Sequence, residues 1–267
     1  MDLGVDKIYV IGLKRFKERR KSILKLAKEL NINIEIIEGY DNINYRNDNK
    51  FVKKHLGNNF FDPAGILTLG VLCCALSHRK AYKAFLDSGE ETALFLEDDV
   101  YFTKNIFNYN FNDVRNELKN TDWGFCSYGR YHEGIHTKTQ ISHNLFKARE
   151  HHYQQYSGHA YVLNKKSAEW YYNNTKTIKY AADVRLEFSP FTQLTLDKSV
   201  FIQEHMKYYT KSWLHKVHRE FFHYTQEDAK WIEKDKVNIS DSIKVKSYKH
   251  IKKGFRDRII DGWEFLL

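Results

Sequence analysis

Apolar residues at the start of the chain follow a strand–helix–strand pattern. Residues 7–13 (KIYVIGL) form a short, β-rich apolar run that is typical of a buried strand. Apolar positions then recur at helical spacing over 17–30, and residues 32–41 alternate briefly before a turn at Gly39. Two strands joined by a helix predict a βαβ unit, with a right-handed crossover and a parallel sheet.

The middle of the chain predicts a second buried strand that ends in acids. Residues 42–64 are polar and rich in Asn, which favours a mobile loop, and residues 65–87 predict a long, mostly apolar helix. The apolar run Ala93–Leu96 then leads directly into Glu97-Asp98-Asp99. Further along we expect a short strand within 122–129, an irregular loop over 130–152, a strand and a helix within 156–174, and a final strand within 199–205.

These elements predict an α/β fold, with a Rossmann-like, mostly parallel sheet flanked by helices. We divide the chain into a catalytic domain, residues 1–211, and a basic, mainly helical C-terminal extension, residues 212–267. Within the extension Ile251, Phe255, Ile259 and Trp263 recur every four residues, as one apolar stripe on a basic helix. Two interpretations stay open: the stripe docks on the catalytic domain, or the helix lies on an anionic membrane surface.

The composition narrows the class of protein. Hydrophobic residues are 42% and charged residues 29%, which excludes a disordered chain. Three cysteines make no disulfide framework, and Cys73 and Cys74 are interpreted as packing residues. No apolar stretch is long enough to span a membrane, and the N-terminus lacks the basic start of a signal peptide. We therefore expect a cytoplasmic protein, while the net charge of +9 favours anionic partners.

Three adjacent carboxylates at the end of a strand repel one another unless a positive charge compensates them. Ligands of open α/β sheets bind beyond the carboxyl ends of the strands, and hard divalent cations prefer oxygen ligands. If the chain stays extended, Glu97 and Asp99 face one Mn²⁺ or Mg²⁺ ion while Asp98 points elsewhere. The alternative is a solvated acidic turn.

Other polar residues are candidates for binding a substrate. Arg15 and Arg19 flank a strand-to-helix turn, where cations and free helical N–H groups suit a diphosphate. The pair Ser77-His78 could contact a phosphate or a sugar hydroxyl, although taken alone it favours an ordinary helix surface with a satisfied histidine. Further candidates, each with a structural alternative, are Gly158 and His159 in a strand, where the histidine could instead be buried in the core, and Asp183 with Arg185, as a general base or a structural ion pair.

In this order the segments resemble glycosyltransferase family 25. The resemblance rests on KIYVIGLKR with the following ERR, on LGVLCCALSH, on ALFLEDDV and on YSGHAYVLNKKSA, and it covers residues 7–205 approximately. The family includes bacterial lipooligosaccharide galactosyltransferases and procollagen galactosyltransferases. The resemblance implies a GT-A-like fold and an inverting, metal-dependent transfer of a hexose from UDP-galactose or UDP-glucose.

The same resemblance implies roles for individual residues. Glu97 and Asp99 match the metal positions. His205 is a candidate third ligand by its position after the last strand, and the resemblance itself does not imply it. Asp183 is the candidate catalytic base. Residues assigned to the acceptor are Gly158, His159 and Arg185, and those assigned to the nucleotide sugar are Ile11, Gly12, Leu13, Arg15, Arg19, Asp41, Ser77, His78 and Asp98. The family often has Asn where Gly12 stands, so the backbone is expected to make the contact there.

The sequence leaves the acceptor and two rival functions open. The acceptor is a glycan or glycolipid, or hydroxylysine in a collagen-like protein. A metal-dependent nuclease or phosphotransferase would also use clustered acids, but a two-metal site needs acids from separate elements. A basic module that binds nucleic acid or a membrane would explain the charge, yet no nucleic-acid-binding motif is present and we expect no nucleic-acid partner.

Overall fold

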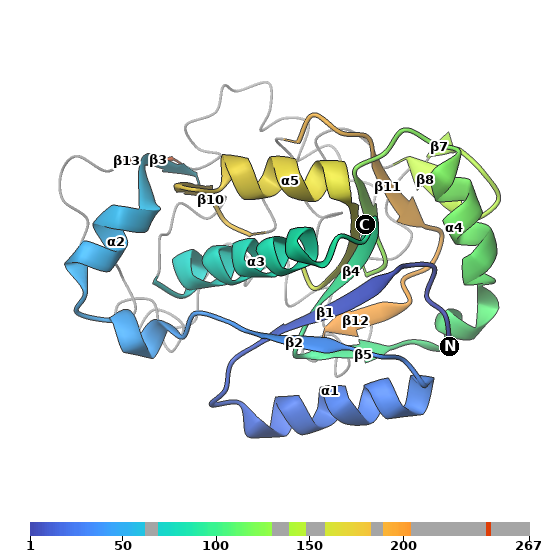
Figure 1. The fold of residues 1–267 in the computed structure, drawn as a ribbon, viewed down its shortest axis with the longest axis horizontal. Helices are drawn as coiled ribbons and strands as arrows, with labels where there is room; N and C mark the ends of the chain where they lie inside the picture. The colour runs from blue at the N-terminus through green and yellow to red at the C-terminus, as the bar shows by residue number, and fades with distance from the viewer. Residues whose placement is uncertain (62–68, 130–138, 148–157, 183–188, 204–243, 247–267) are drawn as a thin grey trace, which may run out of the picture.

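A central eight-stranded sheet organises the chain (Figure 1). The computed structural model describes residues 1–61, 69–129, 139–147, 158–182, 189–203 and 244–246. The strand order is β2-β1-β4-β9-β6-β11-β8-β7. These strands are β1 (Lys7–Gly12), β2 (Glu35–Glu38), β4 (Thr92–Glu97), β6 (Phe125–Ser127), β7 (Thr139–Gln140), β8 (Leu145–Lys147), β9 (Ala160–Asn164) and β11 (Gln193–Leu196).

Smaller sheets and the helices complete the described structure. One small sheet has the order β10-β3-β13, with β3 (Leu56–Phe61), β10 (Ile178–Tyr180) and β13 (Lys244–Lys246), and the other pairs β12 (Phe201–Gln203) with β5 (Val100–Phe102). The helices are α1 (Lys17–Leu30), α2 (Asn49–His55), α3 (Leu69–Ser88), α4 (Phe111–Lys119) and α5 (Lys165–Asn174), with 3-10 turns η1 (Asn42–Tyr45) and η2 (Lys104–Asn108).

The predicted α/β class is confirmed, and so is the βαβ start. Strand β1 pairs in parallel with β2 on one side and with β4 on the other, so the carboxyl ends of these three strands meet at one edge. Strands β9 and β8 run opposite to the rest of the sheet. The sheet is therefore mixed, with most strands in one direction.

Alternation along β1 buries both faces of the sheet. Ile8 and Val10 pack in one core with residues of α1 and α4, while Tyr9 and Ile11 pack in another with residues of α3 and α5. Figure 1 shows α1 on one side of the sheet and the pair α3 and α5 on the other. Burial of each such side chain contributes about 1.5–3 kcal/mol to the free energy of folding. Because both faces of the strand are buried, its sequence is a continuous apolar run.

The prediction of a loop over 42–64 is wrong for its described part. This segment holds η1, α2 and β3. The Asp48 carboxylate accepts a hydrogen bond from the Phe51 N–H at 2.9 Å and caps α2, and Phe51 and Val52 are buried beside Leu69 of α3. Polar residues of this segment therefore act partly as helix caps. The two buried apolar residues of α2 pack this short helix against α3.

Other differences are smaller. The expected irregular loop over 130–152 contains the paired strands β7 and β8, and α4, β5, β10 and β11 were not predicted. The helix expected over 65–87 is α3, Leu69–Ser88. Of the C-terminal extension, Lys244–Lys246 forms β13, which pairs in parallel with β3; the boundary at 211 and the apolar stripe lie outside the described residues. No helix among the described residues is long and apolar enough to cross a membrane.

Candidate functional site

A cavity of about 320 Å³ opens at the carboxyl ends of β1 and β4. Its wall comes from the end of β1 and the start of α1, from the turn after β2, from one face of α3, and from the end of β4. The lining residues are Ile11, Gly12, Leu13, Arg15, Phe16, Arg19, Tyr40, Asn42, Gly70, Cys73, Cys74, Ser77, His78, Glu97, Asp98 and Asp99. All predicted nucleotide-sugar residues except Asp41 are in this wall, together with the predicted metal ligands Glu97 and Asp99.

The three acids do not alternate as an extended chain would. Strand β4 ends at Glu97, and residues 98 and 99 form a turn. Asp98 Oδ1 lies 3.3 Å from Arg19 Nη1, and Asp99 Oδ2 lies 3.5 Å from the same nitrogen. The expectation that Asp98 points away from its two neighbours is thus wrong, because the turn brings Asp98 and Asp99 to one guanidinium.

Asp98 is anchored to β1 as well as to α1. Its Oδ2 accepts a hydrogen bond from the Leu13 N–H at 3.2 Å. A Cβ on Gly12 would lie 2.8 Å from the same oxygen, so the absence of a side chain at this position makes room for the carboxylate. Burial raises the pKa of Asp98, and the Arg19 charge and the Leu13 N–H partly offset that rise.

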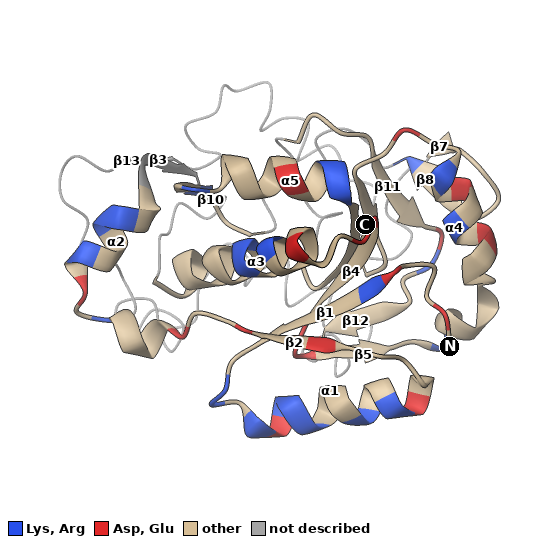
Figure 2. Ribbon diagram, viewed as in Figure 1, with Lys and Arg blue, Asp and Glu red and all other residues tan. Residues whose placement is uncertain are grey.

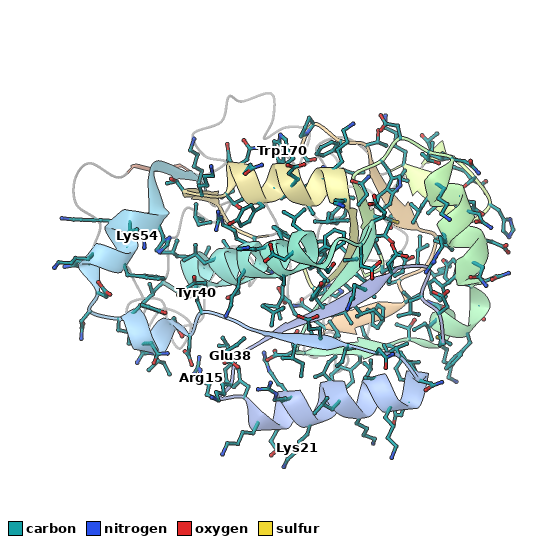
Figure 3. The ribbon with its side chains drawn as sticks, viewed as in Figure 1. Arg15, Lys21, Glu38, Tyr40, Lys54 and Trp170 are labelled. Carbon is teal, nitrogen blue, oxygen red and sulfur yellow. The ribbon has the colours of Figure 1, made fainter. Side chains whose placement is uncertain are left out.

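Basic residues cover the mouth of the cavity beside β2. Arg15 Nε lies 2.9 Å from Asp41 Oδ2, so Asp41 holds a cavity residue without lining the cavity itself. The guanidinium carbons of Arg15 and Arg19 lie 4.3 and 5.0 Å from the centre of the Phe16 ring. Figure 2 shows this basic loop between β1 and α1, and Figure 3 shows Arg15 near Glu38 and Tyr40 at the end of β2. Helix α1 begins here without a side-chain cap, which leaves its positive end at the cavity.

Ser77 fastens α3 to the turn after β2. Its hydroxyl donates to the Cys73 carbonyl at 2.7 Å and accepts from the Tyr40 N–H at 2.8 Å. Gly39 permits this approach, since a Cβ there would lie 2.9 Å from Ser77 Oγ. Ser77 is 3% exposed, so its role in the described structure is to position the Tyr40 backbone at the cavity wall.

His78 and Glu97 belong to a chain of hydrogen bonds that begins in the core. The Tyr82 and Tyr161 hydroxyls are 2.7 Å apart, and Tyr161 Oη lies 2.6 Å from His78 Nδ1. His78 Nε2 lies 3.3 Å from Glu97 Oε1, and the Gln203 side-chain amide donates to Glu97 Oε2 at 2.9 Å. The chain fixes the orientation of both the imidazole and the carboxylate.

The predicted acceptor residues are only partly described. Gly158 and His159 are buried; His159 is fully buried, and its Nε2 lies 3.4 Å from the Phe201 carbonyl oxygen. His159 therefore occupies a core position, as in the alternative interpretation of the sequence. Contact between His159 and an acceptor stays a prediction. Asp183, Arg185 and His205 lie outside the described residues.

Several residues of the site are not among those that the sequence predicts. Phe16, Tyr40 and Asn42 line the cavity, and Tyr161 and Gln203 orient its polar groups. Cys74 was interpreted as packing, yet it lines the cavity one helical turn before His78. The spacing of Cys74 and His78 was the available signal, because residues four apart lie on the same face of a helix.

The donor atoms in the wall are compatible with a hard divalent cation. Glu97 and Asp99 offer carboxylate oxygens to the same cavity, and such oxygens suit Mn²⁺ or Mg²⁺. Arg19 supplies positive charge beside Asp99, so the carboxylate there is compensated in the described structure. Glu97 and Asp99 are the residues that would hold such an ion, and this role stays a prediction.

Several known proteins are similar in sequence to part of this chain. Human procollagen galactosyltransferase 2 is 34% identical over 103 residues, which are 38% of this chain and 16% of that protein. Zebrafish procollagen galactosyltransferase 1 (Danio rerio) is 29% identical over 134 residues, 48% of this chain and 22% of that protein. The mouse inactive glycosyltransferase 25 family member 3 is 31% identical over 109 residues, 39% of this chain and 18% of that protein. The matched region thus spans less than a quarter of each relative.

A solved structure and a family model add to the comparison. A glycosyltransferase involved in glycosylation of the major capsid of PBCV-1 aligns over 85% of this chain and 99% of that chain, with a TM-score of 0.40 and 10% identity. The family model described as glycosyltransferase family 25 (LPS biosynthesis protein) matches residues 5–186, which include every described segment of the cavity wall. Because this match covers more than half of the 267 residues, the chain belongs to glycosyltransferase family 25.

Proposed function

We propose that the protein is an inverting, metal-dependent hexosyltransferase that uses UDP-galactose or UDP-glucose. Family membership alone does not establish activity, since two of the similar proteins have the word inactive in their names. The proposal therefore depends on what the cavity offers to a nucleotide sugar.

One observation carries the proposal: acids and arginines line the same cavity at the carboxyl ends of the parallel strands β1 and β4. Arg15 and Arg19 line the cavity from the segment where α1 begins, and Glu97 and Asp99 line it from the end of β4. A sugar diphosphate needs positive charge for its phosphates and, when the bond to C1 breaks, further charge for the leaving nucleotide. The cavity at the sheet edge combines both requirements, and the start of α1, which no side chain caps, adds to the positive side.

Each group has a distinct part in the proposed transfer. A cation held by Glu97 and Asp99 would supply Lewis-acid stabilisation of the charge on the leaving diphosphate. In this proposal Arg15 and Arg19 bind the diphosphate oxygens, and the nucleoside lies against Tyr40 and Asn42, which line the same cavity. An acceptor hydroxyl attacks C1 from the opposite face, which inverts the configuration, and Asp183 remains the candidate base that accepts its proton.

The acceptor is proposed from chemistry and from the relatives. Two relatives are named as procollagen galactosyltransferases and the family description names LPS biosynthesis, so hydroxylysine in a collagen-like chain and a glycolipid are both candidates. A basic C-terminal extension would favour an anionic glycolipid at a membrane surface. We propose a glycan or glycolipid first, and a collagen-like peptide second.

The first test is release of UDP from a panel of UDP-sugars without an acceptor, in Mn²⁺ and in EDTA. We expect slow hydrolysis of UDP-galactose or UDP-glucose that EDTA abolishes. If no UDP-sugar turns over and UDP with Mn²⁺ fails to raise the unfolding temperature, the cavity is not a donor site. Cleavage of DNA in Mg²⁺ would then support the nuclease instead.

A single substitution tests the acidic edge. Asp99→Asn is expected to lower turnover by about 10²–10³-fold, the usual cost of removing one group that stabilises transition-state charge. The matched control is Asp87→Asn, since Asp87 is exposed on α3 and pairs with Lys83 at 2.7 Å, away from the cavity. Equal turnover of Asp99→Asn and Asp87→Asn, with both variants folded, would overturn the role assigned to Asp99.

A further inference from the structure

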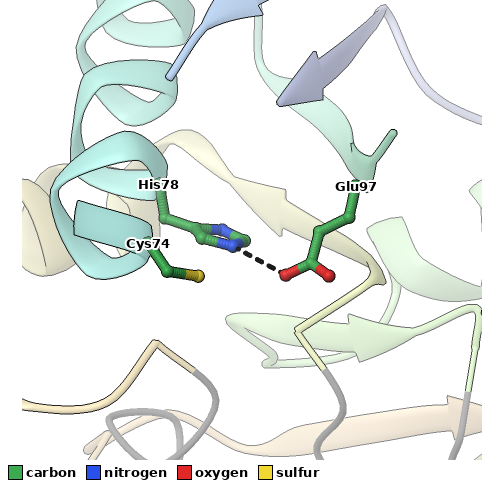
Figure 4. A group of neighbouring side chains, drawn as sticks. All are labelled: Cys74, His78 and Glu97. Carbon is green, nitrogen blue, oxygen red and sulfur yellow. Dashed lines mark hydrogen bonds and ion pairs between the residues drawn. The ribbon is translucent and has the colours of Figure 1, made fainter. Parts of the chain in front are cut away.

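Three side chains of different chemistry converge in the cavity wall (Figure 4). Cys74 and His78 lie four residues apart on one face of α3, and Glu97 ends β4. One ligand atom from each of the three lies within 4.8 Å of the other two. Within the part of the chain that the structure describes, this is the one group of three ligand-type side chains that meets this distance.

The spacing of the nitrogen and the oxygen, long for a hydrogen bond, also matches that of two ligands on one tetrahedral ion. His78 Nε2 and Glu97 Oε1 are 3.3 Å apart. Bonds from Zn²⁺ to nitrogen and oxygen measure about 2.0–2.1 Å, and the tetrahedral angle then separates the two atoms by about 3.3–3.4 Å. A charge-assisted N–H···O bond is shorter, at about 2.7–2.9 Å.

Neighbouring residues already orient two of the three ligands. Tyr161 Oη lies 2.6 Å from His78 Nδ1, so a proton on Nδ1 leaves the Nε2 lone pair directed at the cavity. Gln203 donates to Glu97 Oε2 at 2.9 Å, which leaves Oε1 facing the imidazole. Such outer hydrogen bonds are the usual supports of a metal-binding histidine and carboxylate.

We propose that Cys74, His78 and Glu97 form a site for a borderline-soft transition-metal ion, with Zn²⁺ as the ion of best fit. A thiolate, an imidazole and one carboxylate suit Zn²⁺, whereas Mg²⁺ and Mn²⁺ favour oxygen ligands alone. All three residues line the cavity, so an ion that they held would lie in the cavity wall. The Cys74 thiol releases its proton when the metal binds.

This site goes beyond the proposed transferase, and it shares Glu97 with the donor cation and His78 with the residues predicted to contact the nucleotide sugar. Glu97 would serve either the zinc site or the cation of the donor site, whereas Asp99 belongs to the second alone. Zn²⁺ bound by Cys74 and His78 would therefore withdraw Glu97 from the donor site and inhibit turnover supported by Mn²⁺. Direct metal binding does not depend on any transferase activity, so the two proposals fail separately.

The test uses Co²⁺ as a spectroscopic probe of the full-length, reduced protein. We expect a thiolate-to-cobalt charge-transfer band that Zn²⁺ displaces and that Cys74→Ala abolishes. Cys73→Ala is the matched control, because Cys73 is the adjacent thiol on the same helix and is not in the cluster; it should retain the band. Asp99→Asn should also retain it, which separates this site from the donor cation.

A second variant keeps the proposal testable if Cys74→Ala fails to fold. Tyr161→Phe removes only the hydroxyl that orients His78 and is expected to weaken Zn²⁺ binding, measured by calorimetry, by about 10–100-fold. Cobalt binding without a thiolate band, a band that survives Cys74→Ala, or no zinc binding at micromolar concentrations would each overturn the site. In the last case His78 and Glu97 share a hydrogen bond only.

Discussion

Removal of the Ser77 hydroxyl tests how α3 holds the cavity wall together. Ser77 Oγ accepts from the Tyr40 N–H at 2.8 Å and donates to the Cys73 carbonyl at 2.7 Å. In Ser77→Ala the Tyr40 N–H loses its acceptor, and one missing oxygen leaves less room than a water molecule needs. An unsatisfied, partly buried donor costs about 1–3 kcal/mol, whereas alanine in a helix recovers about 0.5 kcal/mol. We therefore expect the free energy of unfolding to fall by about 1–2 kcal/mol.

The control makes the same chemical change on an exposed helix. Ser22 is exposed within α1, so Ser22→Ala should leave stability unchanged or raise it by about 0.5 kcal/mol. Urea unfolding of both variants measures the difference, with the slope of the transition as a check on two-state behaviour. UDP affinity provides a second readout, because the Tyr40 backbone shapes the cavity and Ser22 does not. Equal stability of the two variants would refute the anchoring role of Ser77.

Two further predictions concern the contact between β1 and the acidic turn. Gly12→Ala places a Cβ 2.8 Å from Asp98 Oδ2 and should lower stability by about 1–3 kcal/mol in urea; adding Asp98→Ala should remove most of that cost, and strictly additive costs would contradict the clash. Burial raises the pKa of Asp98, so the charged carboxylate is disfavoured in the folded state. Relative to Asp98→Asn, the wild-type protein should lose stability as the pH rises above about 4, and a constant difference between pH 4 and pH 7 would argue against this.

Local patterns were sufficient for the elements that build the carboxyl edge of the sheet. The continuous apolar run of β1 and the helical spacing in α1 and α3 record burial against neighbours on each face, so each element can be recognised alone. The apolar run of β4 also shows where this strand ends, because the polar residues begin there. The acids that follow can therefore be assigned to the carboxyl edge of the sheet. Hence most of the predicted nucleotide-sugar residues line one cavity.

Short elements were not recognisable from local pattern. Helix α2 depends on two buried residues and an Asp48 cap, and β11 is a four-residue strand whose position follows from pairing with β6 and β8. The antiparallel direction of β9 between β4 and β6 is likewise a property of the assembled sheet. Pairing partners distant in the chain decide such elements, and no periodicity in a few residues reports them.

Residue types and their order along the chain indicate which kinds of groups meet at the cavity: arginines near the start of α1, acids from the end of β4, and a serine and a histidine from α3. Which atoms face one another depends on how the elements pack. The turn after Glu97 turns Asp98 and Asp99 toward Arg19, and the packing of α3 on the sheet places Cys74 and His78 opposite Glu97. The type of a side chain can be read from its own position in the sequence. Its partner depends on which second element the fold brings within a few ångströms.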